Sequence, residues 1–163
     1  MRNKLKDNEM KLEFISKSNN EAFARITVAA FASQLDPTID ELADIKTAVS
    51  EAVTNCIIHA YENRQGLIRI NAHLSENKIM IQICDNGKGI VNVDAAKEPL
   101  YTTKPNLERS GMGFTIMESF MDDMKVESIV GLGTKVTLTK TIKNQNEEES
   151  TEDENDVMTI TKE

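Results

Sequence analysis

The chain has little of what would anchor a protein in a membrane or stabilise it outside the cell. Its two cysteines, Cys56 and Cys84, form no disulfide or metal-binding pattern, so we expect reduced thiols in a cytoplasmic protein. The longest nearly apolar run, residues 26–32, is far shorter than the roughly 18 residues that a membrane-spanning helix needs. Residues 1–10 are polar and charged, which is unlike a secretory signal.

Basic charge is also scarce. The chain of 163 residues has 19 lysines and arginines against 27 aspartates and glutamates, a formal charge of −8, and contains no basic block. We therefore expect no direct binding to nucleic acid. Residues 144–163 hold eight of the acids and a single base, and they are poor in apolar residues. This composition predicts a disordered acidic tail after a globular unit at residues 10–143, which a flexible stretch at residues 1–9 precedes.

Hydrophobic periodicity predicts the elements of this globular unit. Ser18 with Glu21, and Thr38 with Glu41, have the spacing of capping boxes and indicate where two helices begin; the second helix should run to about Tyr61. Strands are expected at residues 11–16, 67–74, 78–84, 125–130 and 134–142, and a third helix at residues 112–121, after an irregular stretch at residues 85–110. The order predicts an α+β fold, a two-layer sandwich with helices on one face of a mixed, largely antiparallel sheet.

The second predicted helix carries a polar pair, Glu51 and Asn55. Four residues apart, they share one helical face, and the apolar positions lie on the opposite side. A carboxylate can accept a proton from an attacking hydroxyl, and an amide oxygen suits Mg²⁺. If the pair stood alone, a solvated helical face would be the better explanation. His59 continues the same row and is interpreted as a packing or capping residue.

Glycines cluster at three element boundaries, namely residues 85–89 (Asp-Asn-Gly-Lys-Gly), 110–113 (Ser-Gly-Met-Gly) and 131–134 (Gly-Leu-Gly-Thr). Taken alone, the first and third clusters are typical of ordinary turns. Asp85 follows a predicted strand and can accept a hydrogen bond from an exocyclic amine, and glycines let a flat ligand approach the backbone. The second cluster opens a helix, whose free N–H groups attract anions, and Lys104 and Arg109 lie just upstream. There is no P-loop or dinucleotide fingerprint.

The order of these motifs resembles the GHKL ATP-binding superfamily, which joins gyrase, Hsp90, histidine kinases and MutL-type repair proteins. Further short sequence motifs narrow the resemblance to the anti-sigma F factors of endospore-forming bacteria, a family of serine-protein kinases. They are Phe23-Ala-Arg25, Ala29-Ala-Phe31, Gln34-Leu-Asp-Pro-Thr38, Ser50-Glu-Ala-Val-Thr-Asn55, Thr102-Thr-Lys-Pro105 and residues 107–117. The resemblance covers roughly residues 10–142, and the acidic extension has no counterpart in it.

The resemblance implies a role for each motif residue. Glu51 matches the catalytic carboxylate of the family, and Asn55 its Mg²⁺ ligand. Asp85 matches the acid that reads adenine, Gly87 and Gly89 lie beneath the base, and Thr134 helps to hold the base through water. Residues 91–110 would form a lid. Phosphate contacts are expected from Thr103, Lys104, Arg109, Ser110, Gly111, Met112 and Gly113.

The resemblance also implies cofactors and partners. It implies ATP or ADP with Mg²⁺, inhibition of sigma factor F, phosphorylation of an anti-anti-sigma factor on serine, and a homodimer. Arg25, beside small and apolar residues on the first helix, is a candidate docking point for an acidic partner, although a solvated arginine is an equal explanation.

Three other functions remain open. One is a GHKL ATPase or ATP-gated module without protein kinase activity. Another is a detached histidine-kinase domain, for which only His59 and His73 could be phosphate acceptors. The last is a binding module that holds ATP as a structural ligand, for which the carboxylate of Glu51 would be unnecessary.

Overall fold

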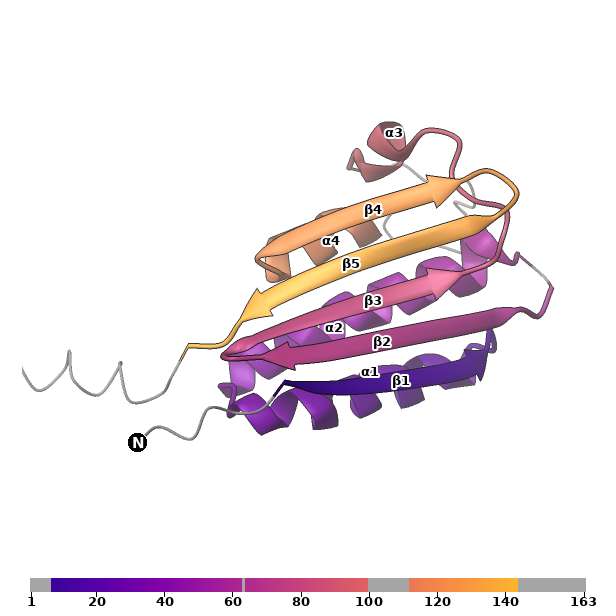
Figure 1. Cartoon of the computed structure of the whole chain (residues 1–163). Coiled ribbons are helices and arrows are strands. Elements are labelled where there is room, and N and C mark those ends of the chain that lie inside the picture. Colours follow the sequence, from indigo (N-terminus) through magenta and orange to yellow (C-terminus); the bar gives the residue numbers. More distant parts are fainter. Residues whose placement is uncertain (1–6, 63, 100–111, 144–163) are drawn as a thin grey trace, which may run out of the picture.

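A five-stranded sheet forms one layer of the protein, and the helices cover one of its faces (Figure 1). The computed structural model describes residues 7–62, 64–99 and 112–143. The strands are β1 (Asn8–Ile15), β2 (Leu67–Ser75), β3 (Lys78–Asp85), β4 (Asp123–Ile129) and β5 (Gly133–Thr141), in the spatial order β1-β2-β3-β5-β4. The helices are α1 (Asn19–Ala32), α2 (Ile39–Asn55), α3 (Val93–Lys97) and α4 (Gly113–Phe120). The predicted α+β sandwich is therefore confirmed.

The sheet departs from the prediction in one detail, because every pairing among the described strands is antiparallel, not mixed. The connections explain this. Two helices, α1 and α2, lie between β1 and β2, so the chain reverses direction three times, an odd number, and β2 pairs antiparallel with β1. The short helices α3 and α4 lie between β3 and β4. These two strands run parallel to each other, because β5 is inserted between them and pairs antiparallel with both.

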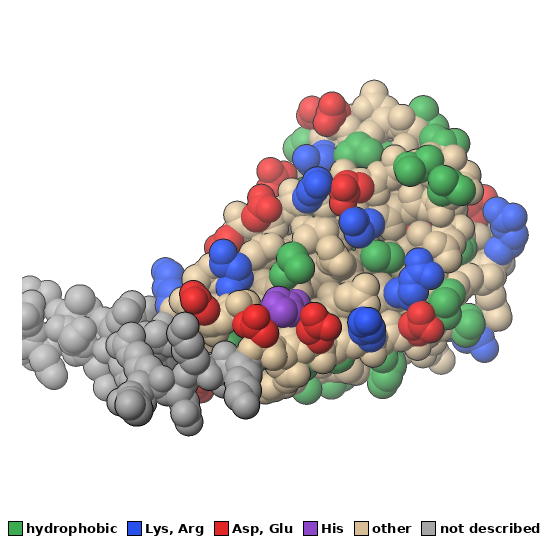
Figure 2. All heavy atoms as spheres, viewed as in Figure 1, with side chains coloured by type: hydrophobic (Ala, Val, Ile, Leu, Met, Phe, Trp, Pro, Cys, Tyr) green, Lys and Arg blue, Asp and Glu red, His purple; other side chains and the backbone are tan. Residues whose placement is uncertain are grey.

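Alternation along the central strands separates a buried face from an exposed one. The inward side chains of β2 and β3 are fully or nearly fully buried, and they are Ile68, Ile70, Ala72, Leu74, Ile79, Ile81 and Ile83. Figure 2 shows the other face of the sheet, on which acidic and basic side chains are scattered without a large apolar patch. Cross-strand pairs form there, such as His73 Nδ1 with Glu9 Oε1 at 3.5 Å and Lys135 Nζ with Glu127 Oε2 at 3.1 Å.

Small side chains bring the helices close together over the buried face. Ala24, Val28 and Ala32 of α1 are completely buried, as are Ala48 and, to within 1% exposure, Ala52 of α2. α2 packs against α1 on one side and α4 on the other. Within the described residues, no helix has both the length and the apolar composition needed to cross a membrane.

Only one of the two predicted capping boxes forms. At α2, the Thr38 hydroxyl accepts a hydrogen bond from Glu41 N at 3.1 Å, and Glu41 Oε2 accepts one from Thr38 N at 2.9 Å. At α1, Ser18 is the N-cap, but its side chain makes no capping bond, because its own backbone is helical and Glu21 N donates to the Ser18 carbonyl at 3.2 Å. The Glu21 carboxylate does not complete the box either, since Arg25 and Ser50 of the neighbouring helix engage it. The capping box predicted at Ser18 was therefore wrong.

The difference between these caps predicts a difference in stability. Replacing Thr38→Ala should lower the free energy of unfolding by about 1 kcal/mol, because the amide of Glu41 loses its partner. Urea denaturation measures the loss, and Ser18→Ala is the matched control that should cost much less. Equal losses in the two variants would contradict the assignment of the caps.

α2 ends differently from the prediction. The α-helix stops at Asn55, and residues Cys56–Ala60 continue it as a π-helical turn, which we call η2. Tyr61 N donates to the carbonyl of Cys56 at 3.2 Å, a five-residue step. Such widened turns are common at functional sites because they redirect the backbone without breaking the helix. Here the turn brings the carbonyl of Ala60 against the chain that follows β3, where Lys88 N donates to it at 3.0 Å.

Candidate functional site

A cavity of about 320 Å³ lies among the end of α2, the chain after β3, α3, the start of α4 and the β4–β5 hairpin. This volume is within the range of pockets that hold small organic ligands. Its walls include Ala52, Asn55, Cys56, His59, Ala60, Asp85, Lys88, Gly89, Ile90, Lys97, Glu98, Gly113, Phe114, Thr115, Val130, Thr134 and Val136. The wall is mostly apolar, and polar side chains from several elements converge on it, as expected for a specific binding site.

Asp85 is a buried carboxylate at the end of β3. It is 6% exposed, and its Oδ1 accepts hydrogen bonds from Gly87 N at 2.9 Å and from Thr134 N at 3.2 Å. Burial raises the pKa of the Asp85 carboxyl, and hydrogen bonds from Gly87, Cys56 and Thr134 oppose part of the rise. A buried acceptor held in place by the backbone is suited to recognise an amine on a ligand.

Cys56 contributes to this arrangement in a way that the sequence did not reveal. Its buried thiol is hydrogen-bonded to the Asp85 side chain. Burial, followed by the nearby charge of Asp85, raises the pKa of Cys56 well above its ordinary value, so the thiol stays protonated. The first residue of η2 is thereby tied to the end of β3. Helical periodicity alone made Cys56 a core residue, because its polar contact comes from a distant strand.

Close packing leaves no room for a side chain at Gly87 or Gly89. A Cβ on Gly87 would lie 2.3 Å from the carbonyl oxygen of Ala60, and one on Gly89, whose φ is +75°, would lie 2.4 Å from that of Ile129. The chain after β3 is therefore pressed against η2 on one side and the β4–β5 hairpin on the other. Contact of these glycines with a flat base stays a prediction.

A hydroxyl cluster holds the hairpin against the pocket. Ser128 Oγ lies 2.9 Å from Thr134 Oγ1 and accepts a hydrogen bond from Ile90 N at 2.7 Å. Thr134 is thus positioned at the cavity wall next to Asp85. Its contact with adenine through water stays a prediction. Ser128 was not singled out, because nothing in its own strand distinguishes it from an exposed serine.

The structure brings Glu51 and Asn55 against the first residue of α4. A Cβ built on Gly113 would lie 3.2 Å from Asn55 Oδ1 and 3.3 Å from Glu51 Oε2. Met112, the N-cap of α4, makes no capping bond through its side chain. The N–H groups that open α4 therefore lie beside a carboxylate and an amide, at the end of the helix that attracts anions.

Several predicted residues cannot be placed in this arrangement. Thr103, Lys104, Arg109, Ser110 and Gly111 lie outside the described residues, as does the acidic tail. Two cations that were not predicted, Lys88 and Lys97, line the cavity, and Lys88 Nζ also pairs with Glu62 Oε1 at 2.7 Å.

The polar side chains beside α4 include a possible ligand for a single metal ion. Within residues 7–62, 64–99 and 112–143, no group of three or more His, Cys, Asp or Glu could hold a metal. Mg²⁺ in phosphate-transfer sites needs only one or two protein oxygens, because phosphates and water supply the rest. The amide oxygen of Asn55, beside the first residue of α4, fits that type of site.

The raised pKa of Asp85 predicts how stability depends on pH. The folded chain holds the Asp85 proton more tightly than the unfolded chain, so folding takes up protons between the ordinary aspartate pKa and the raised one. The free energy of unfolding of the wild type, relative to Asp85→Asn, should be highest below that window and should fall as the pH rises through it. Urea unfolding of both proteins over a pH series measures this difference, and a difference that is constant or grows with pH would contradict the prediction.

Comparisons with known proteins show what this chain is similar to. The family described as "Histidine kinase-like ATPase domain" matches residues 16–140. The chain is 63% identical to an anti-sigma F factor of Clostridium beijerinckii over 137 residues, which cover 83% of this chain and 96% of the relative. It is 62% identical to an anti-sigma F factor of Caldanaerobacter subterraneus over 136 residues, which cover 83% and 95%.

A solved structure supports the fold. The RsbU and RsbW domains of Rv1364c from Mycobacterium tuberculosis match with a TM-score of 0.59 and 17% identity. The match covers 83% of this chain and 32% of that one, so this chain corresponds to about a third of the larger protein.

Proposed function

This chain belongs to the family of anti-sigma F factors, and from that premise we propose that it is a Mg²⁺-dependent serine kinase that inhibits sigma factor F and phosphorylates an anti-anti-sigma factor. Its ATPase-type domain implies that it binds a nucleotide. ATP as phosphate donor and ADP as product are the finer proposal. A partner from the transcription machinery would place its action in the cytoplasm.

One observation carries the kinase proposal: Glu51, Asn55 and Gly113 meet at one point. A pure binding site would need the amide and the helix N-terminus to hold phosphates, but it would not need a carboxylate beside them, since a carboxylate repels phosphate. A group that accepts a proton from an incoming hydroxyl explains Glu51 at this position.

The proposed reaction uses these groups in defined roles. Asp85 accepts a hydrogen bond from the amine of adenine, and Thr134 lies beside it at the cavity wall. Asn55 would hold Mg²⁺, which when bound neutralises charge on phosphate oxygens. The serine oxygen forms a bond to the γ-phosphorus while the bond to the β–γ bridging oxygen breaks, ADP leaves, and Glu51 takes the hydroxyl proton. The N–H groups of α4 stabilise the negative charge, as positioning and electrostatics dominate phosphoryl transfer.

We propose that α1 presents the partner-binding surface. The side chain of Arg25 is 40% exposed, and its Nη1 lies 3.4 Å from Glu21 Oε1, so one end is oriented while the rest is accessible. Phe23 and Ile26 on the same helix are large hydrophobic residues that are 50% and 59% exposed. An arginine beside exposed apolar side chains is a typical centre of a protein interface. The partners would be sigma factor F and the anti-anti-sigma factor, and the active form would be a homodimer.

The alternative is a GHKL ATPase or an ATP-gated binding module without protein kinase activity, and Glu51→Gln separates it from the kinase. Incubated with radiolabelled ATP, Mg²⁺ and an anti-anti-sigma protein, the wild type should label a serine of that protein. Glu51→Gln should lose at least about 100-fold in rate while it retains nucleotide binding, because only the proton acceptor is removed. Glu118→Gln, an exposed glutamate on α4, is the control that should retain full activity.

Two results would count against the proposal. Free phosphate as the sole labelled product would favour the ATPase. Serine labelling that is unchanged in Glu51→Gln would remove Glu51 from its role.

A further inference from the structure

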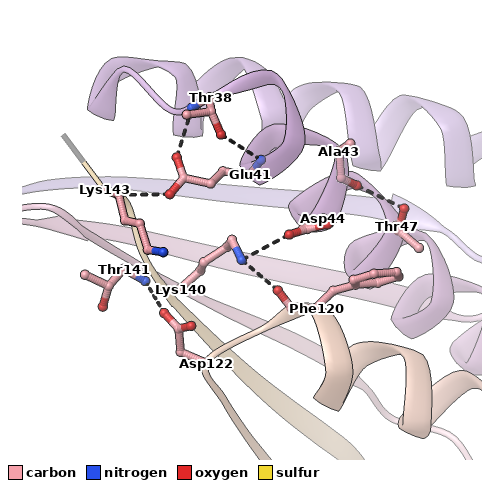
Figure 3. Close-up of polar contacts among 10 residues, drawn as sticks. All are labelled: Thr38, Glu41, Ala43, Asp44, Thr47, Phe120, Asp122, Lys140, Thr141 and Lys143. Carbon is pink, nitrogen blue, oxygen red and sulfur yellow. Dashed lines mark hydrogen bonds and ion pairs between the residues drawn. The ribbon is translucent and has the colours of Figure 1, made fainter. Parts of the chain in front are cut away.

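Lys140 is a cation enclosed in the protein some distance along the sheet from the pocket. It is 8% exposed and lies on the inward face of β5, in line with the buried Val136 and Leu138. Its Nζ donates to the carbonyl oxygen of Phe120 at 2.8 Å and to Asp44 Oδ2 at 3.3 Å (Figure 3). Because lysine is rarely buried unless it is paired, the burial of Lys140 indicates a structural or functional role for its two contacts.

The two partners of Lys140 belong to the two helices of the proposed active site. Phe120 is the last residue of α4, and the final turn of α4 has no basic residue of its own. A cation at the C-terminus of a helix is favourable, since the carbonyl groups there are unpaired and partially negative. Lys140 supplies that cation from β5 and at the same time binds Asp44 on α2. One side chain therefore joins α2, α4 and β5.

The α2 residues that face α4 form a single row. Asp44, Ala48, Glu51 and Asn55 recur at steps of four, three and four residues, which is one face of a helix. At one end of the row, Asp44 reaches the C-terminus of α4 through Lys140. At the other end, Glu51 and Asn55 lie against Gly113, where α4 begins. The completely buried Ala48 lies between, so the two helices can approach closely.

Neighbouring contacts hold Lys140 itself in place. The amide of Lys143, just beyond β5, donates to Glu41 Oε1 at 2.9 Å, which fastens the end of β5 to the first turn of α2. Thr141 N donates to Asp122 Oδ2 at 2.6 Å, which fastens the chain after α4 to β5. Figure 3 shows both contacts flanking the Lys140 side chain.

We propose that Lys140 is a positioning residue for phosphoryl transfer. By clamping the C-terminus of the eight-residue helix α4 to α2, it sets where the first turn of α4 lies relative to Glu51 and Asn55. A short helix behaves as a rigid rod, so movement at its C-terminus displaces its N-terminus. The inference rests on the proposed kinase function, but the position of α4 can be measured without it.

The test replaces Lys140→Met, which keeps most of the apolar stem and removes the charge. Lys135→Met is the matched control, because Lys135 is a more exposed cation on the outward face of the same strand. Serine phosphorylation by the full chain is measured at a temperature at which circular dichroism shows every variant to be folded. We expect kcat of Lys140→Met to fall about 10- to 100-fold, with KM for ATP and the Kd of ADP changed less than about threefold. Lys140→Arg should recover part of kcat, since arginine can donate to both partners.

A second readout follows α4 directly. Hydrogen exchange of the amides at residues 113–120, measured without nucleotide, should quicken in Lys140→Met and not in Lys135→Met. If Lys140→Met does not fold, Asp44→Asn replaces it, since asparagine keeps the shape of the side chain and weakens only the contact of Lys140 with α2. In this variant kcat should fall, and the amides of residues 113–120 should exchange faster.

Each outcome supports or overturns the positioning role of Lys140. Wild-type kcat and wild-type exchange in a folded Lys140→Met or Asp44→Asn would overturn the inference, as would an equal fall of kcat in Lys135→Met. A loss of thermal stability without a change in kcat would also overturn it. If the wild type itself labels no serine, the proposed kinase function fails, and the exchange of residues 113–120 alone then decides whether Lys140 positions α4.

Discussion

The contact between α2 and the beginning of α4 is the interaction on which the pocket depends. Glu51 and Asn55 lie close to Gly113, where a Cβ would be within 3.2–3.3 Å of their side chains, and their helix comes close because Ala48 and Ala52 are small. The result places a carboxylate, an amide and the N-terminus of a helix within one small volume. None of the three would bind or transfer a phosphate alone, and their proximity is what gives them a shared chemistry.

Asp85 introduces the main electrostatic cost of this arrangement. A buried carboxylate is unfavourable unless its oxygens are hydrogen-bonded, and the protein provides donors from the chain after β3, from β5 and from the thiol of Cys56. The same donors fasten three separate elements around the cavity. Asp85, which would recognise the ligand, therefore also holds the pocket together. The chain that follows it is packed so closely that a Cβ on Gly87 or Gly89 would collide with neighbouring backbone.

Sequence patterns predicted the structural features that depend only on residues close together in the chain. The alternation of β2 and β3, the capping box of Thr38 and the shared helical face of Glu51 and Asn55 could all be read from residues two to four apart. The missing capping box at Ser18 could not, because Ser18 itself has a helical backbone and Ser50 of another helix bonds to the Glu21 carboxylate. Likewise, the contact of Cys56 with Asp85 depends on how separate elements pack, and no periodicity within one element encodes it.

The meeting of α2 with Gly113 is tested most directly by isothermal titration of Mg²⁺-ATP and Mg²⁺-ADP into the wild type and Gly113→Ala. Alanine suits a helix better than glycine, so the variant should fold, but its Cβ would press on Asn55 and Glu51. The account predicts measurable binding of both nucleotides to the wild type and, for ATP, a loss of at least about tenfold in the variant, or about 1.4 kcal/mol. Equal affinities in the two proteins, or no heat of binding in the wild type, would contradict it.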